Sequence, residues 1–159
     1  MSFLQFCSLL FVLSNVNTWP SGAPETTCNT LSPGHGANRP KDPSSSPFII
    51  TQSQVEYQPG SPVQVTVKAP VGVSFRGLMI QAYNPLTGEP VGAFQSGRGL
   101  KVLDSCSAVT HMDRRGKRSA MLLWDPPSHR PGRVAFRGTI VERYSDYYEG
   151  LEALPESRS

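Results

Sequence analysis

The fold of this chain follows from PGSPVQVTVKAPVGVSFRGLMIQAY, residues 59–83. In VQVTVK, residues 63–68, valine alternates with glutamine, threonine and lysine. Alternation with a period of two directs one set of side chains inward and the other toward water, so it predicts a strand on a half-buried sheet. APVG at residues 69–72 ends this strand, because proline lacks a backbone N–H donor and glycine accepts turn geometry.

A second strand is expected over residues 75–83. The alternation assigns its side chains to two faces, with Leu78, Ile80 and Ala82 on one and Met79, Gln81 and Tyr83 on the other. Gly77 inside the run is typical of a β-bulge. We expect the two strands to form a hairpin that starts an antiparallel sheet.

The rest of the chain repeats this pattern of short apolar runs separated by turns. Further strands are expected at residues 48–51, 91–94, 120–124 and 134–141. With 14 glycines, 15 prolines and no long helical period, the chain is predicted to be all-β, an immunoglobulin-like antiparallel β-sandwich of about seven to eight strands. The expected core contains Trp124, Phe75, Phe94, Phe136 and the valines.

The first 18 residues differ from the rest. A short apolar run, FLQFCSLLFVL, is followed by small and polar residues, which is typical of a signal peptide and too short to span a bilayer. We therefore expect a signal peptide at residues 1–18, cleaved near residues 17–19, although a membrane anchor or a wrongly assigned start stays open. One domain is expected over residues 19–151, followed by a polar C-terminal tail at residues 152–159. The predicted location is secreted and extracellular, without stable membrane insertion.

Three cysteines are present, and Cys7 lies in the expected signal peptide. Cys28 and Cys106 then remain as an even pair in an oxidising compartment, which predicts a disulfide. Closing so long a loop is worth roughly 4–5 kcal/mol in the chain-entropy model. Two independent buried thiols are the alternative, and a zinc site is disfavoured because neither cysteine has a partner at metal-ligand spacing.

The order of motifs along the chain resembles that of the reelin (reeler) domain family. In chain order the motifs are SGAP at 21–24, Cys28, PGHG at 33–36, YQPG at 57–60, FRGLMIQA at 75–82, VGAF at 91–94, Cys106, LWDPP at 123–127 and GRVAF at 132–136. The resemblance covers nearly all of the chain after the signal peptide. It implies an extracellular immunoglobulin-like sandwich in which Cys28 and Cys106 are bridged, with Tyr148 standing where the family often has tryptophan.

Three functional hypotheses follow from the resemblance. The first is a secreted, non-catalytic module that binds an extracellular protein or glycan. The second is an innate-defence protein, because stand-alone insect members of the family have this architecture. The third is the front part of a ferric-chelate reductase-like membrane protein, whose redox work is assigned to later domains. No cofactor or nucleic-acid partner is expected for this chain.

The densest charge cluster is RRGKR at residues 114–118. One interpretation is a polyanion-binding patch. Its candidate residues are Arg114, Arg115, Lys117, Arg118, Arg133 and Arg137. Arg133 and Arg137 would share one strand face by their even spacing. A dibasic processing site and a solvated loop are the alternatives.

Catalysis has no support in the residue pattern. His35, His111 and His129 are not at spacings that would direct two of them at one metal. No nucleophile elbow or glycine-rich phosphate loop is present. The sequence therefore predicts a protein that is not an enzyme and has no metal site.

Overall fold

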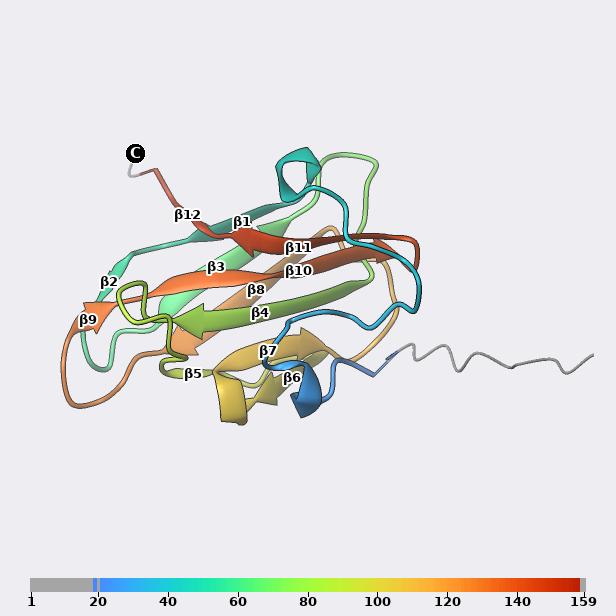
Figure 1. The fold of residues 1–159 in the computed structure, drawn as a ribbon. Coiled ribbons are helices and arrows are strands. Elements are labelled where there is room, and N and C mark those ends of the chain that lie inside the picture. Colours follow the sequence, from blue (N-terminus) through green and yellow to red (C-terminus); the bar gives the residue numbers. More distant parts are fainter. Residues whose placement is uncertain (1–18, 20, 158–159) are drawn as a thin grey trace, which may run out of the picture.

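The computed structural model describes residue 19 and residues 21–157. The expected signal peptide and Cys7 lie outside the described residues. Two five-stranded sheets form the framework of the described chain (Figure 1). The first has the order β12 (Leu154–Pro155), β1 (Ile49–Gln52), β3 (Val63–Lys68), β8 (Ser119–Asp125), β5 (Ala93–Phe94). The second has the order β11 (Asp146–Glu152), β10 (Ala135–Arg143), β4 (Gly77–Tyr83), β7 (Ala108–His111), β6 (Leu100–Leu103).

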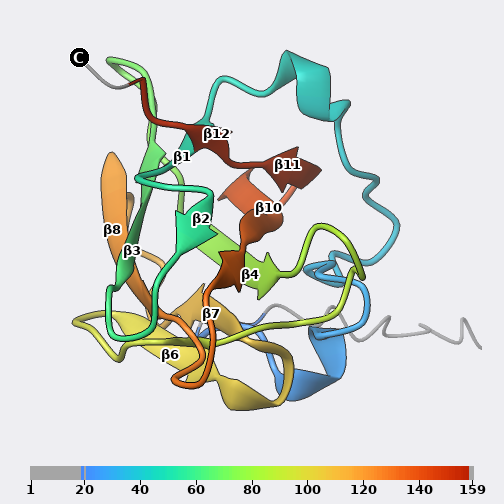
Figure 2. The same ribbon diagram turned by 90° about the vertical axis from the view of Figure 1, so that its left-hand side faces the viewer.

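Shorter elements lie outside the two sheets. Strands β2 (Glu56–Tyr57) and β9 (Gly132–Arg133) pair with each other, and three 3₁₀ turns are η1 (Glu25–Thr27), η2 (Pro43–Ser45) and η3 (Asp104–Cys106). Figure 2 shows the two sheets as separate layers, with β3 and β8 in one and β4 and β10 in the other. The prediction of an all-β sandwich is confirmed. All sheet pairings are antiparallel except that of β1 with β12.

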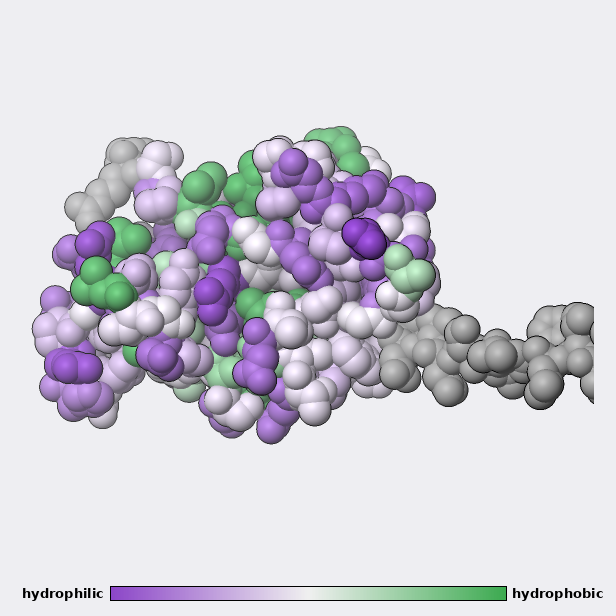
Figure 3. Space-filling model, in the orientation of Figure 1, coloured by the Kyte–Doolittle hydropathy of each residue, from purple (hydrophilic) through white to green (hydrophobic). Residues whose placement is uncertain are grey.

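The core lies between the two layers. Trp124, Phe75 and Phe136 have no exposed surface and Phe94 is also buried, as the sequence predicted. Valines 63, 65 and 67 point from β3 into the same core. Valine alone does not indicate burial, because Val71 in the turn after β3 is fully exposed. On the face shown in Figure 3, hydrophobic residues occur in small groups among hydrophilic ones.

The predicted hairpin of β3 and β4 is wrong. Strand β3 pairs with β1 and β8, whereas β4 pairs with β10 and β7 in the other sheet. The connection between them therefore passes from one sheet to the other at the end of the sandwich rather than turning within one sheet (Figure 1). The bulge expected at Gly77 is not observed either, and the register shifts lie between β10 and β11. A Cβ at Gly77 would lie 2.9 Å from His111 Cε1, so close packing explains this glycine.

The outer face of the second sheet is covered by the chain's own N-terminal part. We call residues 21–47 the N-terminal strap, and Figure 2 shows it running along the outer side of the second sheet. Met79 of β4 lies beneath it, and Gln81 is covered by Cys106 and Arg137; both side chains belong to residues that are only 3% exposed. Both faces of β4 are therefore covered by protein over most of the strand, which the sequence analysis did not anticipate.

Covalent and polar contacts hold the strap in place. The disulfide between Cys28 and Cys106 joins it to η3 across 78 residues, which confirms the predicted bridge. Thr139 Oγ1 donates to Leu31 O at 2.8 Å, and Ala23 N donates to Thr110 Oγ1 at 3.2 Å. Farther along, an ion pair joins Lys41 to Asp146 at 2.6 Å.

The ordered sheet continues beyond the expected domain boundary at residue 151. Glu152 still belongs to β11, and Leu154 pairs in parallel with Thr51 of β1. The backbone N–H of Glu156 then donates to Gln52 O at 2.9 Å. Residues 154–156, within the segment expected as a polar tail, pair with β1, so that β12 forms the edge of the first sheet.

Candidate functional site

The loop between β7 and β8, residues 112–118, carries the charge cluster noted in the sequence. It contains four basic side chains and one acidic one, a net charge of +3, which equals the net charge of the whole chain. Backbone contacts fix both ends of the loop, and at its N-terminal end the Met112 N–H donates to Gly99 O at 2.8 Å. Lys117 forms an isolated bridge with Phe75, and the backbone N–H of Ala69 donates to Arg118 O at 2.9 Å.

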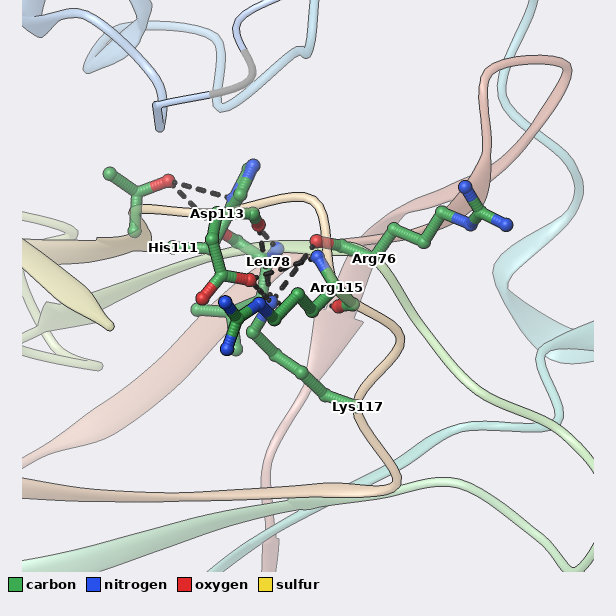
Figure 4. Close-up of polar contacts among 7 residues, drawn as sticks. Arg76, Leu78, His111, Asp113, Arg115 and Lys117 are labelled. Carbon is green, nitrogen blue, oxygen red and sulfur yellow. Dashed lines mark hydrogen bonds and ion pairs between the residues drawn. The ribbon is translucent and has the colours of Figure 1, made fainter. Parts of the chain in front are cut away.

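Lys117 organises this loop rather than facing solvent (Figure 4). Its ammonium donates to Asp113 Oδ1 at 2.7 Å and to the carbonyl oxygens of Arg115 and Asp113 at 2.9 and 3.2 Å. The hydrogen bond from Lys117, with one from the backbone N–H of Arg115, lowers the pKa of the Asp113 carboxyl. The Lys117 side chain is only 18% exposed, so it is a poor donor to an external anion.

Three arginines remain outward in this loop. Arg114, Arg115 and Arg118 are all exposed. A guanidinium has five donors in a planar fork that matches sulfate, phosphate and carboxylate oxygens. The pinned loop therefore presents three such groups from a backbone whose shape is already set, which lowers the entropy cost of binding an anion.

The structure separates the other two candidates from this loop. Arg133 in β9 is exposed but pairs across from Glu56 at the opposite end of β10 from the loop (Figure 1). Arg137 lies over the Tyr83 ring at 4.5 Å and donates to Gln81 Oε1 at 3.0 and 3.1 Å. The six predicted residues thus do not form a single patch.

A neighbouring arginine was missed by the sequence analysis. Because Phe75 pairs with Lys117, Arg76 emerges beside the loop with an exposed side chain. In Figure 4 its side chain extends away from the Lys117 ammonium. Residues 76 and 114 are far apart in sequence, and only the pairing of their strands brings them to the same end, so no local signal could have identified Arg76.

His111 completes the pairing of β4 with β7. The backbone N–H of Leu78 donates to His111 Nδ1 at 3.2 Å, next to the last backbone pair of the ladder. Burial lowers the pKa of His111, and Lys117 adds to this, while the Leu78 carbonyl, Asp113 and the Trp19 backbone oppose it. The lowered pKa favours the neutral form of His111, in which Nδ1 can accept the hydrogen bond from the Leu78 N–H.

We expect stability to fall as the pH drops below about 6.5, and to fall less in His111→Asn. The unfolded histidine binds a proton near that pH, while the folded one resists it, so protons favour unfolding. The contribution of His111 is thus fully present above the unfolded pKa and declines below it. Asparagine offers the Leu78 N–H an acceptor that does not titrate.

Urea unfolding at about pH 7.5 and about pH 5.5 measures how much the free energy of unfolding changes with pH. His129→Asn, at an exposed site, is the control. Equal pH dependence of His111→Asn and wild type would refute the role of His111 in this loss of stability.

Within residues 19 and 21–157, no group of three or more His, Cys, Asp or Glu side chains is placed to hold a metal ion. Over the same residues, no helix has the length and apolar character needed to cross a membrane. The chemistry that the described loop offers is the binding of anions.

Comparison with known proteins identifies the family. The Reeler domain model matches residues 26–155. Ferric-chelate reductase 1 of Bos taurus is 32% identical over 148 residues, covering 88% of this chain and 24% of that protein. The chain thus spans about a quarter of the length of the first curated relatives it matches. Putative defense protein 3 of Antheraea mylitta is 26% identical, covering 98% of this chain and 96% of that protein.

A solved structure supports the fold. The Reelin-N domain of F-spondin superposes with a TM-score of 0.56 and 22% identity, covering 77% of this chain and 94% of the other. The family model matches residues 26–155, and this span contains all the strands of the two-layer sandwich from β1 to β12. This chain belongs to the Reeler domain family.

Proposed function

We propose that this chain is a secreted, non-catalytic interaction module that binds sulfated or other polyanionic glycans through Arg114, Arg115 and Arg118. The observation that carries the proposal is that the charged side chains of the loop have different partners. The Lys117 ammonium pairs with the Asp113 carboxylate at 2.7 Å and holds the loop backbone through two carbonyl oxygens, while the three arginines stay exposed. An anionic polymer would meet three guanidinium groups with no free carboxylate of this loop among them.

Secretion is supported by two features that are independent of the loop. A disulfide between Cys28 and Cys106 is typical of oxidising compartments. The apolar N-terminal run has the length of a signal-peptide core. The interpretation of the loop as a processing site is less favoured, because both Lys117 and Arg118 are hydrogen-bonded through their backbones to the sandwich.

We expect Arg115→Ala/Arg118→Ala to elute from a heparin column at clearly lower salt than the wild type. Contacts between exposed charges are screened by salt, so losing two guanidinium groups lowers both the retention and its salt dependence. Lys117 is left unchanged, because its removal would disturb the loop itself.

The matched control is Arg130→Ala/Arg133→Ala, which removes the same charge from exposed positions at the other end of the sandwich. It is expected to elute near the wild type. Equal shifts in the two double variants would mean that retention follows net charge alone, and the assignment to this loop would be abandoned.

A role in defence is the second candidate function. It is favoured by the similarity to putative defense protein 3 of Antheraea mylitta, which matches this chain almost end to end. Binding of the purified protein to bacterial cells, with an effect on their growth, is the result expected for this role. Absence of both binding and a growth effect would rule out this role.

The hypothesis that the chain is the front part of a reductase-like membrane protein is tested by transcript sequence downstream of Ser159.

A further inference from the structure

A cavity of about 260 Å³ lies between the N-terminal strap and the outer face of the second sheet. Strands β4, β7 and β10 supply its floor, and the strap supplies the opposite wall. It shares Arg114 with the glycan proposal, but the other two arginines of that proposal, Arg115 and Arg118, do not line it.

The walls of this cavity are mostly apolar. Met79 and Val141 contribute from the sheet, and Trp19, Leu31 and Pro33 from the N-terminal side. The Trp19 ring is packed against Gly34, where an added Cβ would lie 3.0 Å from the ring. An apolar group would therefore be desolvated on several sides, at a gain of about 25 cal/mol per Å² buried.

Arginine is the charged residue type among the side chains that line the cavity. Arg76 and Arg114 both reach it and are exposed. Among the residues that the structure describes, neither has an acidic partner within ion-pair distance. Arg143 also lines the cavity, but it is already paired with Glu142 at 3.0 Å and Asp146 at 2.9 Å. Arg76 and Arg114 are thus the two cations that are left for a ligand.

The remaining polar groups are neutral or unpartnered. Burial lowers the pKa of His35, although hydrogen bonding to the Tyr144 backbone and the charge of Glu149 oppose this effect. Burial likewise lowers the pKa of His111, which also lines the cavity, while the nearby Lys117 charge acts in the same direction and Asp113 opposes it. His35 Nδ1 is buried and has no hydrogen-bond partner among the described atoms. Within the described part of the chain, no carboxylate side chain lines the cavity to repel an anion.

We propose that this cavity binds a small amphipathic anion, with its apolar body under the strap and its carboxylate on Arg76 and Arg114. The size follows from the volume. An engineered apolar cavity of roughly 150 Å³ accepts benzene, so about 260 Å³ suits an apolar body on the order of ten carbon atoms. A charge-assisted pair of guanidinium contacts would select the anion over a neutral molecule of the same length.

The probe for this proposal is decanoate, with decanol and decyltrimethylammonium as neutral and cationic analogues. Titration calorimetry of the secreted protein is expected to show saturable binding of decanoate, about ten-fold or more tighter than that of decanol. Trp19 fluorescence should change with the same affinity, since its ring lines the cavity while Trp124 is buried in the core.

Two variants test separately the contribution of the arginine charges and that of the apolar space. Arg76→Ala/Arg114→Ala is expected to bind decanoate about ten-fold more weakly and to lose the preference over decanol. Val141→Phe fills the cavity from β10 and is expected to abolish binding of both, while Leu123→Phe, on a half-exposed position of the first sheet, leaves it unchanged. A thermal unfolding curve for each variant confirms that it is folded.

The proposal is overturned if decanoate gives no saturable binding, or if the double arginine variant binds decanoate as the wild type does. Binding to anionic phosphatidylglycerol vesicles without binding of free decanoate would also overturn it, because the ligand would then be a membrane surface. Heparin retention of Arg115→Ala/Arg118→Ala is measured separately, so failure of one proposal leaves the other testable.

Discussion

Replacing Trp124 by alanine is expected to lower the free energy of unfolding by about 3–5 kcal/mol. Trp124 has no exposed surface and packs edge-on against Tyr57 at 5.2 Å and Phe136 at 5.7 Å. Its indole Nε1 donates to Val91 O at 2.9 Å. The substitution therefore removes contacts from both layers of the sandwich and leaves a cavity that the surrounding strands cannot fill.

Urea unfolding followed by circular dichroism measures this loss. Leu86→Ala is the control, because Leu86 is 79% exposed and its truncation should change stability by less than about 0.5 kcal/mol. A change of less than about 1 kcal/mol in Trp124→Ala would show that this residue is not at the centre of the core.

Removing the bridge, as Cys28→Ser/Cys106→Ser, is expected to cost about 4–5 kcal/mol. The bridge spans 78 residues, so its loss returns much conformational freedom to the unfolded chain. It also frees the strap from η3. Leu103, Met79 and Ala108 then lose the segment that covers them.

The second effect has its own measurement. Limited proteolysis should cut the double variant within residues 21–47 while the strands remain intact, and the wild type after reduction should behave in the same way. Ser105→Ala, beside Cys106 on an exposed position, is the matched control and should resist cleavage. Equal protease resistance of the double variant and the wild type would show that noncovalent contacts alone hold the strap.

The sequence contained enough to predict the strands but not their partners. Alternation in residues 63–68 and 78–82 correctly identified which side chains face the core. The same alternation is expected whether two consecutive strands pair in one sheet or face each other across a core. The hairpin of β3 and β4 was therefore predicted wrongly, since nothing local to residues 69–76 distinguishes a turn from a crossing.

The sequence pattern also could not predict that the outer face of the second sheet is covered. Period-two patterning assumes that one face of a strand meets water, and Gln81 fits a wet face by its chemistry. In the structure its amide donates to Cys106 O at 3.1 Å and accepts from Arg137. The strap that excludes water comes from residues far away in sequence, so the pattern within β4 could not reveal it.

The sequence located the cluster of basic residues, but it could not show which of them are exposed and which are engaged by other side chains. Lys117 and Arg118 are adjacent, yet one is fixed by Asp113 and the other is exposed. Arg137 was expected in the patch because of its spacing from Arg133, whereas stacking on Tyr83 engages it elsewhere. Arg76 was absent from the prediction, because its place beside the loop depends on a long-range bridge.

The N-terminal strap, bound through one disulfide, is central to this account, because it covers the second sheet and forms one wall of the cavity. Peptide mapping of the secreted protein, digested without reduction after alkylation of free thiols, tests it most directly. The account predicts one cross-linked pair of peptides that contains Cys28 and Cys106 and separates on reduction. Recovery of both cysteines as alkylated, separate peptides would contradict it.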